Sequence, residues 1–297
     1  MKILVSGASG LVGTNLIPTL LAKGNQIYKL VRREPRGIDE IHWDAEGGLI
    51  EQEKLEDFDA VVHLAGDSVA SENWSEEKKR KIRDSRVTGT RTLVDALKRC
   101  VNPPKHFVSA SATGFYGNRG GEILNEESAP GKGFLPEVCQ EWETEALKAE
   151  NFGARVVLLR TGIVLAKDGG ALAKMLTPFK FGVGGTVGSG KQWMSWIALD
   201  DMIKIIHFAL ENENLRGAIN VVAPNAATNE EFTRTLGAAL NRPTVLPMPE
   251  FAIKMLFGEM GETLLLEGAR VYPQKLLDAK FEFDYTNLEN ALKHVLK

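Results

Sequence analysis

A glycine-rich turn near the N-terminus has the clearest chemical meaning in this sequence. Gly7, Gly10 and Gly13 recur every third residue, directly after a short apolar run and directly before a helical pattern. Because glycine has no side chain, such a turn lets backbone N–H groups and the start of the next helix approach a diphosphate. The turn therefore predicts a dinucleotide site. The expected contacts are Gly7, Ser9, Gly10, Leu11, Val12 and Gly13.

Two consecutive arginines end the second apolar run. Arg32 lies nineteen residues after Gly13, and Arg33 follows it. An NAD site would carry an aspartate or glutamate here to accept a hydrogen bond from the ribose 2′-hydroxyl. A guanidinium fork suits a 2′-phosphate instead, because it can donate two parallel hydrogen bonds to phosphate oxygens. The pair therefore predicts NADP as the cofactor, and a pair of solvated surface arginines is the alternative.

Composition argues against several other classes of protein. The 297-residue chain has 36 Lys and Arg against 39 Asp and Glu, a net charge of −3, whereas a nucleic-acid binder needs surplus positive charge. Its 2 cysteines and 5 scattered histidines suit neither a disulfide framework nor a metal site. No apolar run approaches the roughly 20 residues that span a bilayer, and no signal peptide precedes the first run. We expect a cytoplasmic protein without metal, membrane or nucleic-acid partners.

The elements that must position these residues alternate along the first half of the chain. Short runs that lack strict alternation cover 2–6, 26–31, 60–65, 106–111 and 155–160. Helical patterns cover 11–23, 75–99 and 136–150. Strands that are apolar on both faces are typical of a parallel sheet covered by helices on each side. We therefore expect an α/β fold, a Rossmann-like doubly wound parallel sheet.

The character of the sequence changes after residue 165. A strand-like run at 218–222 precedes Thr228-Asn229-Glu230-Glu231, a capping-box pattern that should open a helix ending at Leu240. We expect a smaller C-terminal α/β lobe that holds the substrate. The predicted division is a dinucleotide-binding domain over 1–165, to which 193–222 returns, and a substrate lobe made of 166–192 and 223–297.

The order of these segments resembles an atypical extended short-chain dehydrogenase/reductase of the NAD(P)-dependent epimerase/dehydratase superfamily. After the glycine turn come Asp59 to Gly66, Phe107 to Ser111, and Tyr116-Gly117. More narrowly, the chain resembles an epimerase-like, cell-division-inhibitor-like subfamily that carries a C-terminal domain of unknown function. The segments that carry this narrower match are 138–143, 188–197, 200–201, 217–220, 223–225 and 242–243. The resemblance implies further cofactor contacts from Leu64, Ala65, Gly66, Arg86 and Ser109.

The resemblance also implies catalytic residues, from which this chain departs. Ser111 matches the superfamily's serine after the fifth strand, and Thr113 lies close by. Leu135 and Cys139 stand where the superfamily has a Tyr-x-x-x-Lys pair, and Arg86 replaces its helical asparagine. Another group must then exchange the proton with the substrate. The substitutes near the expected nicotinamide end are Tyr116, Glu137, Cys139 and Glu141.

A second glycine-rich segment, residues 185–191, fits most of a phosphate-binding P-loop. Gln192 stands in place of the final serine or threonine, and an aromatic, strand-like run follows instead of a helix. The magnesium-binding hydroxyl and the helix N-terminus are therefore both missing, which argues against an ATPase. We expect a loop at the substrate cleft, with Lys191, Gln192 and Trp193 as substrate contacts.

Other charged residues have structural interpretations. His63 lies within an apolar run and is expected to be a core histidine. Lys78 to Lys81 form a basic cluster flanked by acids, which is typical of a solvated helix face. Arg160 ends a core strand, with Asp201 as a possible partner in a structural ion pair. The acidic pair at 200–201 is expected to cap the following helix.

Two functions remain open. The first is an NADP-dependent oxidoreductase or epimerase acting on a small polar molecule, nucleotide-linked sugars included, with Ser111 and Thr113 polarising a carbonyl or hydroxyl. The second is an NADPH-binding sensor with little or no catalysis, which the missing Tyr and Lys favour. We favour the enzyme because the polar and aromatic segment at 191–196 suits a substrate pocket. The chain is expected to be a monomer, or a homodimer through the helices at 75–99 and 136–150.

Overall fold

A computed structural model describes residues 1–297, and an eight-stranded sheet forms its centre. The strand order is β12-β8-β6-β5-β1-β2-β3-β4, and all neighbours pair parallel except β3 and β4. The bounds are β1 (Lys2–Ser6), β2 (Gln26–Val31), β3 (Glu40–Asp44), β4 (Leu49–Ile50), β5 (Ala60–His63), β6 (His106–Ala112), β8 (Arg155–Thr161) and β12 (Gly217–Val221). The strands β2 to β4 follow on one side of β1, and β5, β6, β8 and β12 follow on its other side. In open α/β sheets, ligands bind where the strand order switches sides in this way.

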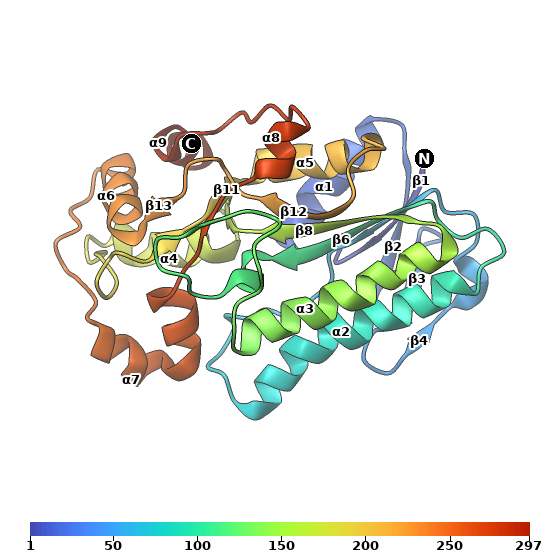
Figure 1. Cartoon of the computed structure of the whole chain (residues 1–297), viewed down its shortest axis with the longest axis horizontal. Coiled ribbons are helices and arrows are strands. Elements are labelled where there is room, and N and C mark those ends of the chain that lie inside the picture. The colour runs from blue at the N-terminus through green and yellow to red at the C-terminus, as the bar shows by residue number, and fades with distance from the viewer.

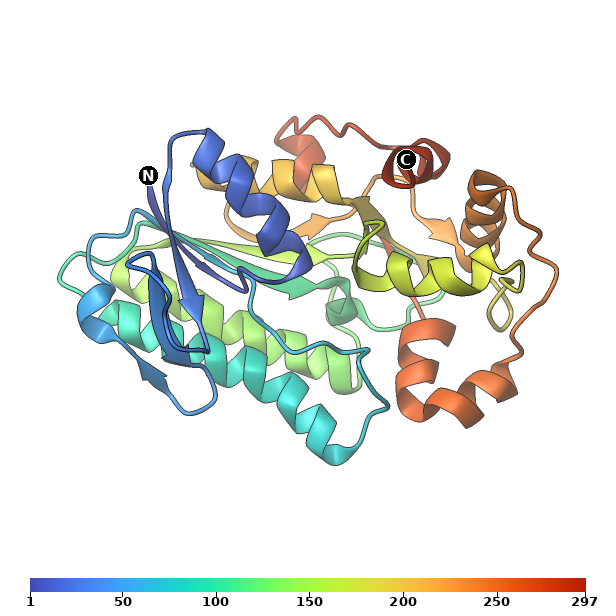
Figure 2. The ribbon, with the colours of Figure 1, turned by 180° about the vertical axis from the view of Figure 1, so that it is seen from behind.

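Helices cover both faces of the sheet (Figures 1 and 2). One layer contains α1 (Leu11–Ala22) and α5 (Leu199–Glu211), and the other contains α2 (Glu76–Lys98) and α3 (Phe134–Leu147). Side chains alternate along β1, so that Ile3 and Val5 pack with Leu16 of α1 while Leu4 packs with Leu93 of α2. Because both faces are buried, most residues of the central strands are apolar. The structure thus confirms the expected Rossmann-like sheet.

The third and fourth strands in chain order, β3 and β4, were not predicted. β3 reads Glu-Ile-His-Trp-Asp, and its polar residues interrupt the apolar run that marks the other strands. It still extends the sheet, because Ile41 and Trp43 are buried against the α2 face. An edge position tolerates such polar residues, since one side of the strand meets solvent or a short neighbour.

Most of the C-terminal part forms a smaller body at one end of the sheet, whereas α8 (Gln274–Asp278) packs beside β12 of the sheet itself (Figure 1). The other helices of this part are α4 (Gly170–Lys180), α6 (Asn229–Leu240), α7 (Glu250–Gly261) and α9 (Leu288–Val295), with the π-helical turn η4 (Glu262–Leu266) after α7. Its short strands are β9 (Ile163–Leu165), β10 (Trp193–Met194), β11 (Trp196–Ala198), β13 (Ala227–Thr228) and β14 (Arg270–Val271), and β14 pairs with β7 (Ile123–Leu124). The predicted capping box opens α6, since Thr228 and Glu231 each accept from the other's backbone N–H. None of the helices combines the length and apolar character needed to cross a membrane.

Candidate functional site

The glycine turn forms a close-packed cradle between β1 and α1. A Cβ on Gly7, whose φ is +68°, would lie 2.7 Å from the carbonyl carbon of Leu64, and a Cβ on Gly13 would lie 2.4 Å from the Gly7 carbonyl oxygen. Gly10 is the N-cap of α1, with no side chain to satisfy the first N–H groups and no acidic residue in the first turn. These N–H groups remain available to an anion. The turn therefore has the geometry that a diphosphate site requires.

A buried pair, Ser6 and His63, holds the strand ends that border this cradle. The Ser6 Oγ accepts from the backbone N–H groups of Leu64 and Ala65 and lies 2.6 Å from His63 Nδ1. Its own hydrogen must then go to Nδ1, so His63 Nε2 carries the ring proton and donates to Thr90 Oγ1 at 2.9 Å. Burial lowers the pKa of His63 to about 4, which keeps the ring neutral. The residue is a core histidine, as predicted.

The two arginines at the end of β2 have different environments. Arg33 donates through both terminal nitrogens to the Glu40 carboxylate, at 2.6 and 2.7 Å. This hydrogen bonding lowers the pKa of Glu40 to about 2, so the pair is charged. Arg32 is exposed and forms no hydrogen bond or ion pair within the chain. The prediction that Arg33 binds a phosphate together with Arg32 stays a prediction: Arg33 is paired with Glu40, whereas Arg32 has no partner in the chain.

A cavity of about 1310 Å³ opens at the carboxyl ends of the central strands and continues between them and the C-terminal body. The predicted site residues that line it are Gly7, Gly10, Leu11, Val12, Gly13, Leu64, Ala65, Gly66, Arg86, Ser111, Thr113, Cys139, Gln192 and Trp193. The predicted residues outside its lining are Ser9, Arg32, Arg33, Ser109, Tyr116, Glu137, Glu141 and Lys191, and Glu141 is paired with Arg83. The structure thus brings the glycine turn and the expected catalytic serine into one space. Ser109 is fully buried within β6, and Lys191 is exposed to solvent.

The positions of the missing Tyr-Lys pair lie on the cavity wall. Leu135 and Cys139, four residues apart on α3, both face Gly114, whose added Cβ would lie 3.5 Å from Leu135 Cβ and 3.9 Å from Cys139 Sγ. Burial raises the pKa of the Cys139 thiol to about 12. A thiol that stays protonated is a poor base and a poor nucleophile. The environment therefore argues against Cys139 as the substitute for the missing lysine.

Tyr116, another expected substitute, points away from the cavity into the core. It is fully buried, its hydroxyl donates to Asn220 Oδ1 at 2.7 Å, and it accepts from Arg160 at 3.0 Å. Burial raises the pKa of the phenol. With both hydrogen-bonding functions used inside the protein, Tyr116 cannot exchange a proton with a substrate in the cavity.

Ser111 is joined to a buried ion pair behind the cavity wall. Its Oγ donates to Glu143 Oε1 at 2.6 Å, and Arg160 donates to both oxygens of the same carboxylate at 2.8 Å. The expected partner of Arg160 was Asp201, which is wrong: the Asp201 carboxylate accepts instead from the backbone N–H groups of Asp284 and Tyr285. Asp201 therefore anchors a distant loop and does not cap α5, whose N-cap is Ala198.

The sequence analysis missed Glu143, although a signal for it exists. Glu143 follows Cys139 by four residues on α3, and residues spaced this way share one face of a helix. Leu135, Cys139 and Glu143 therefore lie on the same face of α3, the face directed at the end of β6.

Thr113, the other residue expected to polarise the substrate, forms one long hydrogen bond: its hydroxyl donates to the Thr161 carbonyl oxygen at 3.5 Å.

Arg86 contributes a largely buried cation to the cavity. Its guanidinium donates one hydrogen bond, to the Ile82 carbonyl oxygen at 3.0 Å, and its central carbon lies 5.3 Å from the centre of the Trp142 ring. It lies against Gly66, where an added Cβ would meet it at 3.2 Å. Burial lowers its pKa, and no carboxylate pairs with it. A cation in this position would stabilise an anionic group in the cavity.

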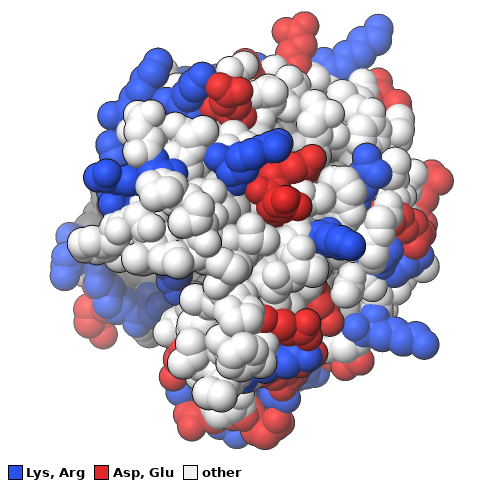
Figure 3. Space-filling model, turned by 90° about the vertical axis from the view of Figure 1, so that its left-hand side faces the viewer, with Lys and Arg blue, Asp and Glu red and all other residues white.

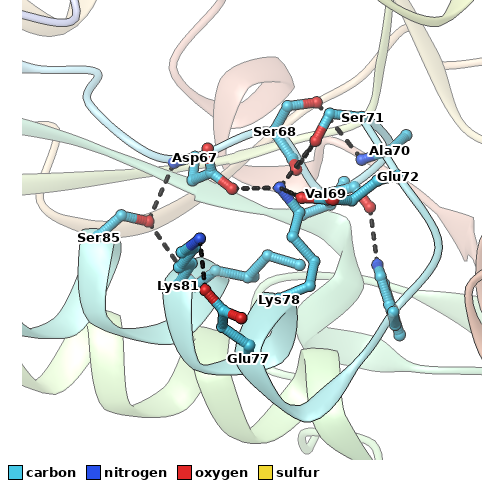
Figure 4. A network of polar contacts seen from close by, with 12 residues as sticks. Asp67, Ser68, Val69, Ala70, Ser71, Glu72, Glu77, Lys78, Lys81 and Ser85 are labelled. Carbon is cyan, nitrogen blue, oxygen red and sulfur yellow. Dashed lines mark hydrogen bonds and ion pairs between the residues drawn. The ribbon is translucent and has the colours of Figure 1, made fainter.

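A loop over residues 67–74 covers one side of the cavity, with Val69 and Ala70 in the lining. Figure 4 shows Lys78 of α2 directed at this loop, where its Nζ donates to Asp67 Oδ2 at 2.5 Å and to Ser71 Oγ at 2.7 Å. The side chain of Lys78 is only 4% exposed. The expectation that Lys78 belongs to a solvated face is therefore wrong, because its ammonium group holds the loop in place.

The glycine-rich segment at 185–191 forms no phosphate-binding loop. The strand β10 follows it instead of a helix, and the Gly188 N–H donates to the Met248 carbonyl oxygen. Gln192 uses its side-chain amide to bridge the carbonyl oxygens of Val187 and Leu265. Through these hydrogen bonds the segment is tied to Met248 and to Leu265 of the C-terminal body, beside the cavity.

Comparison with known proteins extends the similarity over the whole chain. Residues 3–222 match the NAD dependent epimerase/dehydratase family, and residues 248–295 match a domain of unknown function, DUF1731. The human epimerase family protein SDR39U1 is 35% identical over 299 residues, covering 100% of both chains. The epimerase family protein ML0860 of Mycobacterium leprae is 39% identical, covering 98% of this chain and 94% of its own.

Solved structures agree with these sequence matches. The crystal structure of human SDR39U1 with NADPH superposes with a TM-score of 0.91 at 34% identity and covers 99% of both chains. The UDP-glucose 4-epimerase of Thermus thermophilus, at 21% identity, shares the fold with a TM-score of 0.77 over 99% of this chain and 98% of its own. The glycine cradle, the sheet order and these matches lead to one assignment. The chain belongs to the NAD dependent epimerase/dehydratase family and carries a C-terminal DUF1731 domain.

Proposed function

We propose that this protein binds NADPH and catalyses hydride transfer to or from a carbonyl or hydroxyl carbon of a substrate held in the cavity. One observation carries the proposal: the glycine cradle and Ser111 line the same cavity. The human relative that shares this fold at 34% identity was crystallised with NADPH. When bound, the cofactor supplies or accepts the hydride.

Several residues of this chain fit a dinucleotide. The turn from Gly7 to Gly13 would hold the diphosphate, since added side chains there would collide with Leu64 and with the turn itself. Arg32 would bind the 2′-phosphate, because its guanidinium is exposed and unpaired at the end of β2. The Leu64–Gly66 segment would border the ligand beyond the end of β5.

The Ser111–Glu143 pair offers a proton path in place of the missing tyrosine and lysine. In the direction of alcohol oxidation, the substrate hydroxyl would give its proton to Ser111 Oγ while Ser111 passes its own proton to Glu143. The reverse sequence would protonate the substrate oxygen during reduction. Arg160 would hold the carboxylate in position through its two hydrogen bonds. Ser111 thus takes the role of the residue that contacts substrate, and Glu143 that of the proton store.

The test is a binding and turnover assay on the purified protein. We expect NADPH to bind, as measured by its fluorescence, and a panel of carbonyl compounds and alcohols to contain substrates that change its absorbance. Ser111→Ala should lower kcat roughly 100-fold or more, because it removes the proton path, and leave the Kd for NADPH unchanged. Ser189→Ala, an exposed serine outside the cavity lining, is the control. Full turnover in Ser111→Ala would remove this residue from the mechanism.

A second candidate function is an NADPH sensor without catalysis. It is favoured by the fact that neither a tyrosine nor a histidine lines the cavity, so the usual proton donors are missing. NADPH binding without turnover across a broad panel would support the sensor. Binding of neither NADPH nor NADH would contradict both functions.

A further inference from the structure

The part of the cavity formed by the C-terminal body has an apolar wall. Its residues come from α4, α6, α7 and η4, which lie beyond the end of the sheet (Figure 1). The helix α4 packs against α6, and η4 packs against α7. Met175, Phe232, Ile253, Phe257, Leu264 and Leu265 contribute to it. Apolar surface of this kind favours ligands whose own carbon surface is removed from water on binding.

Several polar side chains on the same wall already bind other parts of the protein, whereas the hydroxyl groups of Thr233 and Thr263 form no hydrogen bond within it. Asn229 Oδ1 accepts from the Val187 N–H at 2.9 Å, and the Gln192 amide donates to two carbonyl oxygens. Glu259 is paired with Lys79 at 3.1 Å. Glu267 has no partner, and burial raises its pKa, which favours its uncharged form. Besides its apolar side chains, the wall therefore offers a ligand two hydroxyl groups and one carboxyl group.

This wall also lacks the charge that a nucleotide-linked sugar needs. Such a substrate carries a diphosphate, which proteins bind with cations or with helix N-termini. The cationic residues that line the cavity are Arg86, Lys132 and Lys174. Arg86 lies on the cofactor side against Gly66, Lys132 is exposed just before α3, and Lys174 donates to the Ala70 carbonyl oxygen. Lys174 is therefore the one lining cation on an element of the apolar wall, and it is hydrogen-bonded to a backbone carbonyl oxygen.

The mouth of the cavity is apolar as well. Val183, Leu246 and Met248 line the cavity and are 53%, 53% and 40% exposed. Figure 3 views this end of the molecule and shows uncharged surface as continuous white areas between charged side chains. Large hydrophobic side chains left in contact with water at a cavity mouth mark a ligand-binding entrance. An apolar ligand would cover them as it enters.

We propose that the substrate is a carbonyl compound or alcohol with an apolar body of alkyl or aryl carbons, and not a small sugar or a sugar joined to a nucleotide. This inference rests on the proposed hydride transfer for the reacting group, and on the apolar wall for the rest of the molecule. The functional carbon lies toward Ser111, and the apolar body extends between α4, α6 and α7.

Binding of apolar probes to the protein saturated with NADP⁺ tests this inference. N-phenyl-1-naphthylamine, a neutral dye that fluoresces in apolar surroundings, should bind in a saturable manner. A series of 2-alkanones from hexanone to dodecanone should displace it, with each added methylene tightening binding roughly fourfold until the space is filled. UDP-glucose should not displace it. Displacement by UDP-glucose, together with no dependence on chain length, would overturn the inference.

Matched variants separate the cavity from the outer surface. Met175→Lys introduces a charge on the half-buried cavity wall, whereas Met255→Lys makes the same change on α7 at a side chain that is 79% exposed and outside the lining. We expect the first to weaken dye and alkanone binding at least tenfold and the second to leave both unchanged. Met175→Gln, which keeps the side-chain length, is used if Met175→Lys does not fold, and a smaller loss is then expected. Equal effects of cavity and surface variants would contradict the inference.

The NADPH titration distinguishes this inference from the proposed function. NADPH binding without binding of the dye or alkanones would overturn the apolar substrate and leave hydride transfer standing. Chain-length-dependent binding of alkanones without binding of NADPH would overturn hydride transfer and retain the apolar site.

Discussion

Single charged residues in this protein differ chiefly in whether another side chain already binds them. Arg33 is held by Glu40, and Arg160 is held by Glu143 with two hydrogen bonds at 2.8 Å. Arg32 and Arg86 have no carboxylate partner, and they lie at the end of β2 and beside Gly66. Cations without partners are the ones that can bind phosphate groups of a ligand. This distinction selects Arg32 as the residue that should decide between NADP and NAD.

We expect Arg32→Ala to weaken NADPH binding about 10- to 100-fold, the loss of one charge-assisted hydrogen-bonding group. NADH, which lacks the 2′-phosphate, should bind almost as before. Fluorescence titration of both nucleotides measures the difference, and each serves as a control for the other. An equal loss for NADPH and NADH would contradict the role of Arg32.

His63 should make stability depend on pH. Its pKa is about 4 in the folded protein against 6.5 for an unperturbed histidine, because burial disfavours the charged ring. Between these values the unfolded chain binds a proton that the folded protein does not, so stability falls as the pH decreases from about 6.5 to 4. The loss from this residue is about 3 kcal/mol. Urea unfolding at a series of pH values measures it, and His63→Gln should show a shallower slope than the wild type.

At the scale of elements, the approach of α1 to the end of β1 shapes the dinucleotide site. Gly13 lets the first turn of the helix lie directly against the Gly7 carbonyl, and Ser6 and His63 fix the neighbouring end of β5. On the other face, α3 carries Leu135, Cys139 and Glu143 toward the end of β6. One helix thus supplies the N–H groups for an anion, and another supplies the carboxylate behind Ser111.

Gly13→Ala should disrupt this helix–strand contact. Its Cβ would lie 2.4 Å from the Gly7 carbonyl oxygen, a backbone atom that cannot move without shifting the turn. We expect a loss of roughly 1–3 kcal/mol of stability, as for other overpacked sites, and NADPH binding weakened at least tenfold. Gly121→Ala is the control, because an added Cβ there meets nothing within 4 Å. Unchanged melting temperature and affinity in Gly13→Ala would contradict the close packing.

The whole molecule combines two parts around one cavity. We propose that residues 1–165 with 193–222 act as the dinucleotide-binding domain, and that 166–192 with 223–297 act as the substrate lobe. The lobe is not separate from the sheet, since Leu276 and Phe281 pack in the same core cluster as Ile3. Shared core of this kind favours cooperative unfolding of both parts.

Phe232→Ala tests this cooperativity. Phe232 of α6 is buried against Leu172 of the lobe and Trp196 of the 193–222 segment, and its removal should cost about 3–5 kcal/mol. Urea unfolding followed by far-UV circular dichroism and by tryptophan fluorescence should give one midpoint, lowered equally for both probes. Phe251→Ala, at a side chain 68% exposed on α7, is the control. Separate midpoints for the two probes would show that the lobe unfolds by itself.

Local patterns in the sequence determined much of the fold and the cofactor cradle. Apolar runs marked the strands β1, β2, β5, β6, β8 and β12, and the glycine spacing and the Thr228 capping box marked α1 and α6. These features are readable because strand burial, turn conformation and helix capping depend on residues that are close in sequence. Resemblance to a family added the positions where a tyrosine and a lysine are missing.

Only the tertiary structure decided which of the candidate residues are available for chemistry. Tyr116 is turned into the core by Asn220 and Arg160, Arg33 is occupied by Glu40, and Lys78 is buried under the 67–74 loop. The apolar wall likewise combines helices that are far apart along the chain. Burial and ion pairing depend on side chains brought together from distant segments, so local sequence patterns do not contain them.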